Sequence, residues 1–191
     1  CIGGEAVYQV SSSRDNLEED YRGYESTGSE LTFSDYYNNY IGIRFQNINI
    51  PQGATITEAY LEFTAYDTYR YSGASMQIQA VANDDADDFY PNYRHQLRDL
   101  DKTSGVTWSM PSFRRYSDYT SPDLSSIVSD IVNRPGWEPG NAMAFVFSDF
   151  TSYRGVYSYN DVPSAAPRLV VKFNGNATPG ASSTVRELLI S

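Results

Sequence analysis

The side chains of this chain that could perform chemistry are mainly carboxylates, beginning with an acidic run in which Asn83, Asp85 and Asp87 alternate. Alternate oxygen ligands are typical of the calcium-binding EF-hand loop, but Asp88 stands where that loop needs glycine and Arg94 where it needs glutamate. The run is therefore not an EF-hand. Two interpretations remain open: the carboxylates bind calcium together with backbone carbonyls, or they form a solvated loop that ends a strand.

A second acidic set consists of Asp15, Glu18 and Glu19, in a polar loop that follows the first predicted strand. If the first and last strands of the fold are neighbours, Asp161 lies close to these three residues. Four oxygen donors would then share one end of the fold.

Catalytic arrangements have little support in the sequence. The one histidine, His95, lies between Arg94 and Arg98 in a polar segment, so no Ser-His or Cys-His pairing is indicated. Zinc, dinucleotide and phosphate-loop spacings are missing from the sequence. Paired carboxylates are frequent enough to imitate a glycosidase by chance, so a hydrolase is only a distant third hypothesis.

Tyrosine is unusually abundant, with 17 residues, and it concentrates in residues 36–40, 66–71 and 153–160. Such side chains either pack on strand edges or offer flat faces on which sugars stack. Both interpretations stay open. The candidate ligand-binding residues are Tyr36, Tyr37, Tyr40, Tyr69, Tyr71, Tyr157 and Tyr159.

The elements that must position these residues are predicted from the stretch between Ile41 and Ala65. Its two halves alternate apolar and polar residues, the pattern of strands with one buried face, around the turn Pro51-Gln52-Gly53. Further strands are expected at residues 6–10, 31–33, 75–82, 106–108, 142–148, 155–159 and 168–173. The fold class is all-β, a β-sandwich or jelly roll.

One short α-helix is predicted at about residues 122–133. Ser121 is a good N-cap, Pro122 suits the first helical position, and the apolar residues from Leu124 to Ile131 form one stripe. We expect this helix to plug or flank an open end of the sandwich.

Four segments carry a family resemblance: residues 11–19, 41–65, 121–147 and 166–173. Together they resemble the extracellular β-sandwich domains related to disaggregatase, called DNRLRE domains and grouped with carbohydrate-binding modules. The resemblance covers residues 1–173. It implies a secreted or surface-attached, non-catalytic binding or architectural role, and a structural calcium ion near the terminal strands, which Asp15, Glu18, Glu19 and Asp161 would hold.

The balance of 14 basic and 24 acidic residues gives a formal net charge of −10. Such a charge disfavours nucleic acid and favours cations or neutral glycans as partners. The chain is long enough for one large sandwich domain, residues 1–173, followed by a linker and tail, residues 174–191.

Both termini carry possible attachment points. Cys1 is the one cysteine, and it could carry a lipid, form an intermolecular disulfide or mark a cut point in a longer chain. The apolar end of the tail could fray, begin another domain or pair with the sheet edge of a neighbouring subunit. The residues of the tail that could join such an assembly are Thr184, Val185, Leu188, Leu189 and Ile190.

The leading hypothesis is therefore a non-catalytic structural or adhesive module of a cell-surface appendage. It would self-assemble into a homopolymer by terminal strand exchange, or bind other surface proteins, with calcium as a structural ion. The alternative is a carbohydrate-binding module that recognises polysaccharide through its tyrosine-rich loops. Either protein is expected outside the cell or at its surface, with membrane contact only through a lipid on Cys1.

Overall fold

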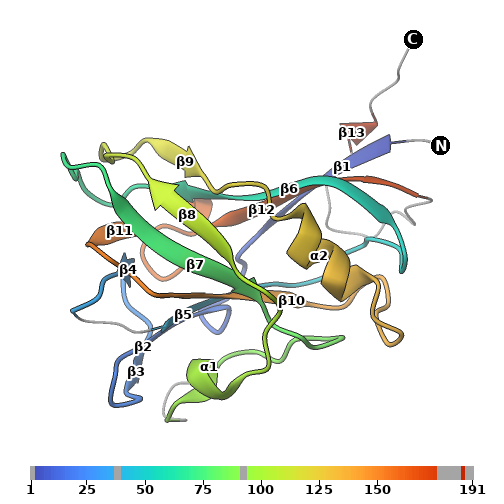
Figure 1. Ribbon diagram of the computed structural model, residues 1–191, viewed down its shortest axis with the longest axis horizontal. Helices are drawn as coiled ribbons and strands as arrows, with labels where there is room; N and C mark the ends of the chain where they lie inside the picture. Colours follow the sequence, from blue (N-terminus) through green and yellow to red (C-terminus); the bar gives the residue numbers. More distant parts are fainter. Residues whose placement is uncertain (1–2, 37–39, 91–93, 176–185, 188–191) are drawn as a thin grey trace.

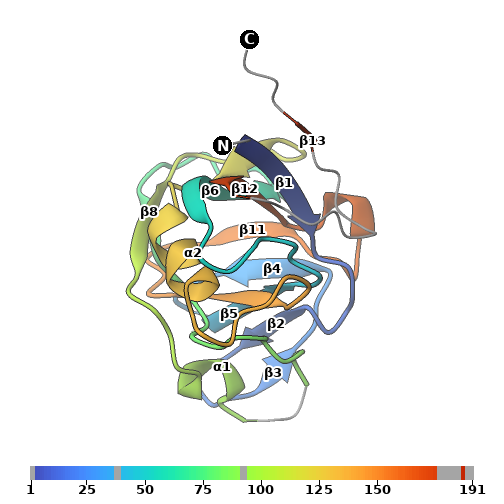
Figure 2. The same ribbon diagram turned by 90° about the vertical axis from the view of Figure 1, so that its right-hand side faces the viewer.

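The fold is a sandwich of two antiparallel β-sheets, seen in a computed structural model that describes residues 3–36, 40–90, 94–175 and 186–187 (Figure 1). Figure 2 shows the two sheets as separate layers, with β1, β12 and β6 above β5, β2 and β3. The predicted all-β class is thus confirmed. Alternation of apolar and polar residues explains it, because each sheet buries one face against the other.

The first sheet has the order β13-β1-β12-β6-β9. Its strands are β1 (Gly3–Gln9), β6 (Thr55–Thr64), β9 (Asp118–Thr120), β12 (Arg168–Asn174) and β13 (Arg186–Glu187). The first and last long strands, β1 and β12, pair along their whole length from Gly3↔Asn174 to Gln9↔Arg168. The condition stated for bringing Asp161 near Asp15, that the first and last strands are neighbours, is therefore met.

The second sheet has the order β3-β2-β5-β10-β7-β8, and β11 pairs with β4 in a separate ribbon. The strands are β2 (Asn16–Glu19), β3 (Glu25–Ser26), β4 (Glu30–Phe33), β5 (Tyr40–Phe45), β7 (Ala74–Ala80), β8 (Val106–Met110), β10 (Met143–Ser148) and β11 (Arg154–Tyr157). The Pro51 turn reverses the chain but carries it from β5 in one sheet to β6 in the other. Consequently β5 and β6, the two strands predicted between Ile41 and Ala65, do not pair with each other.

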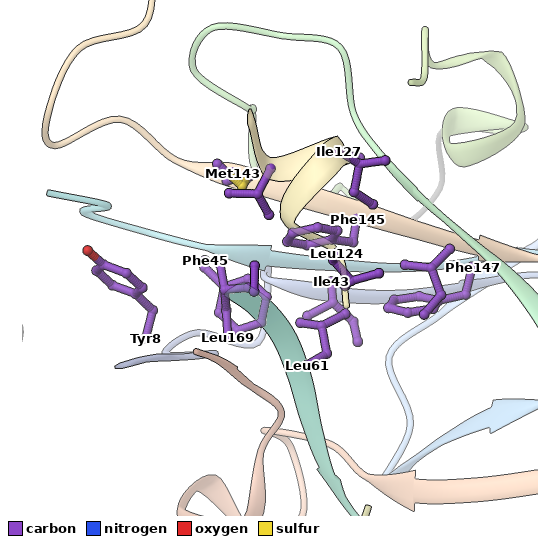
Figure 3. Packing of buried hydrophobic residues seen from close by; sticks show 14 of the residues in the cluster. Tyr8, Ile43, Phe45, Leu61, Leu124, Ile127, Met143, Phe145, Phe147 and Leu169 are labelled. Carbon is purple, nitrogen blue, oxygen red and sulfur yellow. The ribbon is translucent and has the colours of Figure 1, made fainter. Parts of the chain in front are cut away.

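Aromatic rings fill the space between the sheets (Figure 3). Phe33 packs edge-on against Phe63 with ring centroids 5.7 Å apart, and Phe147 lies 5.7 Å and 5.9 Å from these two rings. Helix α2 (Ser125–Val132) adds Ile127 and Val128 to the same core. Because α2 contacts β6 and β7, one strand from each sheet, it closes an open side of the sandwich as predicted.

The start of α2 differs from the prediction. Its N-cap is Leu124, without a side-chain cap. Ser121 instead bonds to β6, where its Oγ accepts a hydrogen bond from the backbone N–H of Leu61 at 2.9 Å. Asp123 likewise accepts from the N–H of Ala59 at 3.0 Å. These two side chains replace the strand partner that the edge of β6 lacks at this point.

Two further short helical elements were not predicted from the sequence, one in the polar segment before β8 and one just before β12. They are α1 (Gln96–Asp99) and the 3-10 turn η1 (Pro163–Ala165). Through Leu97, α1 covers a second apolar cluster on the outer face of the second sheet, formed with Leu17, Phe89, Val146 and smaller residues. Strand β10 is therefore buried on both faces, which explains its nearly continuous apolar sequence.

Candidate ligand-binding surface

Six tyrosines from three distant chain segments converge at one end of the sandwich. The segments are the loop between β6 and β7, the turn between β8 and β9, and residues 153–157 at β11; they lie at the left-hand end of Figure 1. Ring centroids lie 5.3 Å apart for Tyr69 and Tyr153 and 5.0 Å apart for Tyr66 and Tyr157. We call Tyr66, Tyr69, Tyr71, Tyr116, Tyr153 and Tyr157 the tyrosine surface.

Backbone hydrogen bonds hold the three segments together. Tyr69 and Phe113 exchange N–H···O bonds of 2.8 Å in both directions, which joins the first segment to the second. Arg115 N–H donates to Thr68 Oγ1 at 3.1 Å, and Tyr66 N–H donates to the carbonyl of Gly155 at 2.9 Å. The positions of the rings therefore follow from a continuous network and not from the rings alone.

Arg154 is the buried centre of this network, with only 2% of its surface exposed. Its guanidinium donates to the carbonyls of Tyr71, Pro111 and Tyr153. It also lies 5.6 Å from the ring centroid of Tyr69. Burial lowers the pKa of Arg154, since it disfavours the charged form, but a guanidinium remains charged at neutral pH. A positive charge without a carboxylate partner thus lies under the rings.

A hollow of about 420 Å³ opens beside Arg154, lined by residues 68–71 and 152–154. Tyr71, at its edge, is 86% exposed. Close to it, the hydroxyl of Tyr153 donates to Glu30 Oε1 at 3.0 Å. Gly155 is needed here, because an added Cβ would overlap Glu30 Oε2 and lie 2.8 Å from the Tyr69 hydroxyl. Burial, together with the hydrogen bond to Glu30, raises the pKa of Tyr153 and keeps it a donor.

Tyr116 presents the other open ring, with 67% of its surface exposed. Its φ of +65° is in the left-handed region, which costs a residue with a side chain about 1 kcal/mol. The turn is held there by a bond of 2.9 Å from Tyr116 N–H to the carbonyl of Ala65. Arg115 lies against both Tyr66 and Tyr116. Backbone strain at an exposed aromatic residue is the kind of feature that occurs at binding sites.

The predicted ligand-binding tyrosines divide between this surface and other places. Tyr69, Tyr71 and Tyr157 belong to it, although Tyr157 is only 5% exposed and supports the other rings where an open face was expected. Tyr36 is exposed after β4, and Tyr40 begins β5 beside Lys102. Tyr159 packs partly buried against the core, and Tyr37 lies outside the described residues.

Four contributors were missed as individual residues. Tyr153 and Tyr66 lie in segments that the sequence marked as tyrosine-rich, so composition gave a partial signal. The sequence gave no signal for Tyr116 and Arg154. Their contacts depend on the order of the strands in the sheets, which the sequence does not show.

The carboxylates that could hold calcium do not come together. Asp15 is fully buried, with Oδ1 accepting from Arg44 Nη1 at 2.8 Å and Oδ2 from Gln46 Nε2 at 2.6 Å. Its neighbours Glu18 and Glu19 turn to different elements. Glu18 accepts from the N–H of Thr32 at 2.5 Å, and Glu19 from the N–H of Leu97 in α1 at 2.7 Å. These oxygens act as hydrogen-bond acceptors for the fold, so the set does not fit one ion.

The remaining candidate ligands are more exposed. Asp85 accepts from the N–H of Ala142 at 2.7 Å, and Asp87 and Asp161 are exposed. Among the residues that the structure describes, no group of three or more His, Cys, Asp or Glu side chains is placed to hold a metal ion.

A second hollow, of about 440 Å³, lies over the outer face of the second sheet between Val81 and Leu100. Its walls carry opposite charges that are already paired in part, since Asp88 lies 3.1 Å from Arg14 and Asp99 lies 2.7 Å from Arg98. The tyrosine surface is the better candidate because the rings of Tyr71 and Tyr116 are open and because, in the described part of the chain, its arginines form no ion pair.

Comparisons with known proteins assign this chain to no family. No protein-family model matches the chain, and no curated protein is similar to it. A solved structure of a meso-active, thermostable cellulase, derived from the cellulase of Rhodothermus marinus, aligns with 95% of this chain and 91% of its own at 14% identity, with a TM-score of 0.23. At that score the likeness carries no argument. In the described part of the chain, none of the helices has the length and apolar character needed to cross a membrane.

Proposed function

We propose that this protein is an extracellular carbohydrate-binding β-sandwich that binds polysaccharide through its tyrosine surface without catalysing a reaction. One observation carries the proposal: tyrosines from segments more than 80 residues apart in the sequence form one surface with open rings beside a polar hollow.

The chemistry of the surface suits a sugar. The exposed faces of Tyr71 and Tyr116 can stack against the C–H groups of a pyranose ring. Arg70, Ser152 and Tyr153 line the hollow and can serve hydroxyl groups as hydrogen-bond donors or acceptors. The volume of about 420 Å³ is within the range usual for small-ligand sites, roughly 300–1,000 Å³.

Native affinity electrophoresis on gels that contain different polysaccharides tests this function. We expect at least one polysaccharide to retard the protein, and Tyr71→Ala or Tyr116→Ala to reduce the retardation. Tyr21→Ala is the matched control, because Tyr21 is 61% exposed but lies in the turn after β2. Incubation with the retarding polymer should release no new reducing ends. Retardation that survives both substitutions, or its absence with every polymer, would overturn the proposal.

A fibre subunit is the second candidate function. Two residues of the C-terminal segment pair with β1, as Gly4↔Glu187 and Glu5↔Arg186, so this sheet edge can accept that segment. The same edge could accept it from a neighbouring copy. Thr184, Val185, Leu188, Leu189 and Ile190 lie outside the described residues. Electron microscopy and light scattering before and after removal of residues 175–191 test this candidate. A monomer in both forms would contradict it, and filaments that persist without the tail would contradict assembly through that segment.

A further inference from the structure

The tyrosine surface is positively charged, in contrast to the whole protein. Residues 66–71, 113–117 and 153–157 contain four arginines (Arg70, Arg114, Arg115 and Arg154) and one aspartate, and Glu30 adds one negative charge beside Tyr153, so the formal charge is +2 in a chain whose total is −10. The total charge favoured cations or neutral glycans, but a ligand responds to the local potential within a Debye length of about 10 Å.

These four arginines also lack ion-pair partners in the part of the chain that the structure describes. There the ion pairs within 4 Å involve other arginines, namely Arg14, Arg44, Arg98, Arg134 and Arg168, together with Lys172. The nearby carboxylates form no ion pair with these arginines in the described residues, although their charges offset part of the positive charge. Asp67 accepts from the N–H of Thr68 at 2.7 Å, and Glu30 accepts from Tyr153.

The hollow beside Tyr71 concentrates this charge, because two of its seven lining residues are Arg70 and Arg154 and none is acidic. Arg154 is fixed by carbonyl acceptors that offer no countercharge. Arg70 is exposed and able to close over a bound group. Four of the five N–H donors of Arg154 already bond to carbonyls, so Arg154 contributes mainly its charge. Arg70 can donate hydrogen bonds in the geometry that matches carboxylate and sulfate, and the two residues together form a binding place for an anion.

We propose that the tyrosine surface binds acidic polysaccharide, with a carboxylate or sulfate group of the glycan seated in the hollow between Arg70 and Arg154 and its sugar ring against Tyr71. This inference rests on the carbohydrate-binding function proposed above and adds the class of glycan.

Titration calorimetry of the full chain tests it with two forms of one polymer. The first is a soluble polyuronate, and the second is the same polymer after its carboxyl groups have been reduced to alcohols. The two share backbone and linkage and differ in charge. We expect the acidic form to bind about tenfold more tightly, the effect of one charge-assisted contact. Sodium sulfate should weaken this binding more than sodium chloride at equal ionic strength, because sulfate competes for the hollow.

Arg70→Gln removes the adjustable charge from an exposed side chain and leaves the buried network intact. It should weaken binding of the acidic polymer about tenfold and leave binding of the reduced polymer unchanged. Arg22→Gln is the matched control, since Arg22 is also exposed and lies in the turn after β2. This variant should bind both polymers as the native chain does.

The outcomes separate the two proposals. Equal affinity for the acidic and reduced polymers overturns the preference for acidic glycans and leaves carbohydrate binding standing. Equal competition by sulfate and chloride, or an unchanged affinity in Arg70→Gln, contradicts the proposal that an anionic group of the glycan lies in the hollow. No binding of either polymer or of the neutral polysaccharides contradicts the carbohydrate-binding function itself, even if inorganic sulfate binds.

Discussion

The ring of Tyr116 lies parallel to the ring of Tyr157, with their centroids 6.0 Å apart and their planes inclined by 13°. Tyr116 is open to solvent, whereas Tyr157 is buried. The buried ring of Tyr157 therefore supports the ring of Tyr116, whose other face is open to solvent. Two residues 41 positions apart share this role because the turn after β8 reaches across to β11.

Replacement of the exposed ring should separate binding from stability. Tyr116→Asn removes the stacking face but keeps a residue that tolerates positive φ, so the relief of strain offsets the lost ring contact. We expect the free energy of unfolding to change by less than about 1 kcal/mol and glycan affinity to fall roughly fivefold. Urea denaturation and the affinity gels measure the two quantities, and Tyr21→Asn serves as the control. A variant with native affinity would exclude Tyr116 from the site.

The stability of the protein should depend on pH through Glu18. Burial raises the pKa of its carboxyl group to about 7, although hydrogen bonds from Thr32 and Ser26 oppose this shift. The folded chain then binds the proton more tightly than the unfolded chain, whose glutamate pKa is about 4.3. This contribution to stability is complete below pH of about 4.3 and is lost as pH rises through about 7, roughly 3 kcal/mol in all.

Glu18→Gln should flatten this dependence in urea denaturation between pH 4.5 and 8. Some slope should remain, because burial also raises the pKa of Glu19. Glu138→Gln, which changes an exposed glutamate, is the control. An unchanged slope in Glu18→Gln would mean that other groups cause the pH dependence.

Asp15 should stabilise the fold through Arg44 and not through a bound ion. Asp15→Asn leaves the Arg44 guanidinium, 15% exposed, without its carboxylate, and we expect a loss of about 3 kcal/mol. Arg44→Met in the same chain should recover part of this loss, since the unpaired charge is then gone. Calcium or a chelator should leave the Tm of the native chain unchanged. A Tm rise with calcium that disappears in Asp15→Asn would support the calcium-site prediction.

Gly42 should be necessary for packing on the outer face of the second sheet. A Cβ at this position would lie 2.6 Å from Leu97 Cδ2 and 2.8 Å from Phe89 Cζ, both in the cluster beneath α1. Gly42→Ala should therefore destabilise the protein by about 1–3 kcal/mol. Gly4→Ala is the matched strand substitution, because its nearest atom would be 3.6 Å away. Equal denaturation midpoints in the two variants would contradict the packing explanation.

Periodicity predicted the long strands and α2, because the burial of alternate or helically spaced residues fixes them locally. Strand β2 was missed, since its sequence Asn-Leu-Glu-Glu reads as a polar loop although all four residues are buried. Glu18 has its partner in Thr32 and Glu19 in α1, both outside β2. The sequence showed these carboxylates but not their acceptor roles, and calcium was expected there from the family resemblance.

The tyrosine surface was likewise predictable only in part. Tyr69 and Tyr71 could be identified because the 66–71 segment is rich in tyrosine. The joining of that segment to β11 could not, because it depends on the isolated bridge between Ala65 and Val156 and on the order of strands. Arg154 resembled any surface arginine until its burial was known.

The hydrogen bonds that join Tyr69 to Phe113 and Tyr66 to Gly155 belong to the fold itself. The backbone of the loops that carry the tyrosine surface has consequently given up its conformational entropy during folding, and an incoming glycan has only exposed side chains such as Arg70 and Tyr71 left to order. Association should then need no rearrangement of the loop backbone, and differences in affinity among glycans should come from the ligand's own rigidity and its contacts.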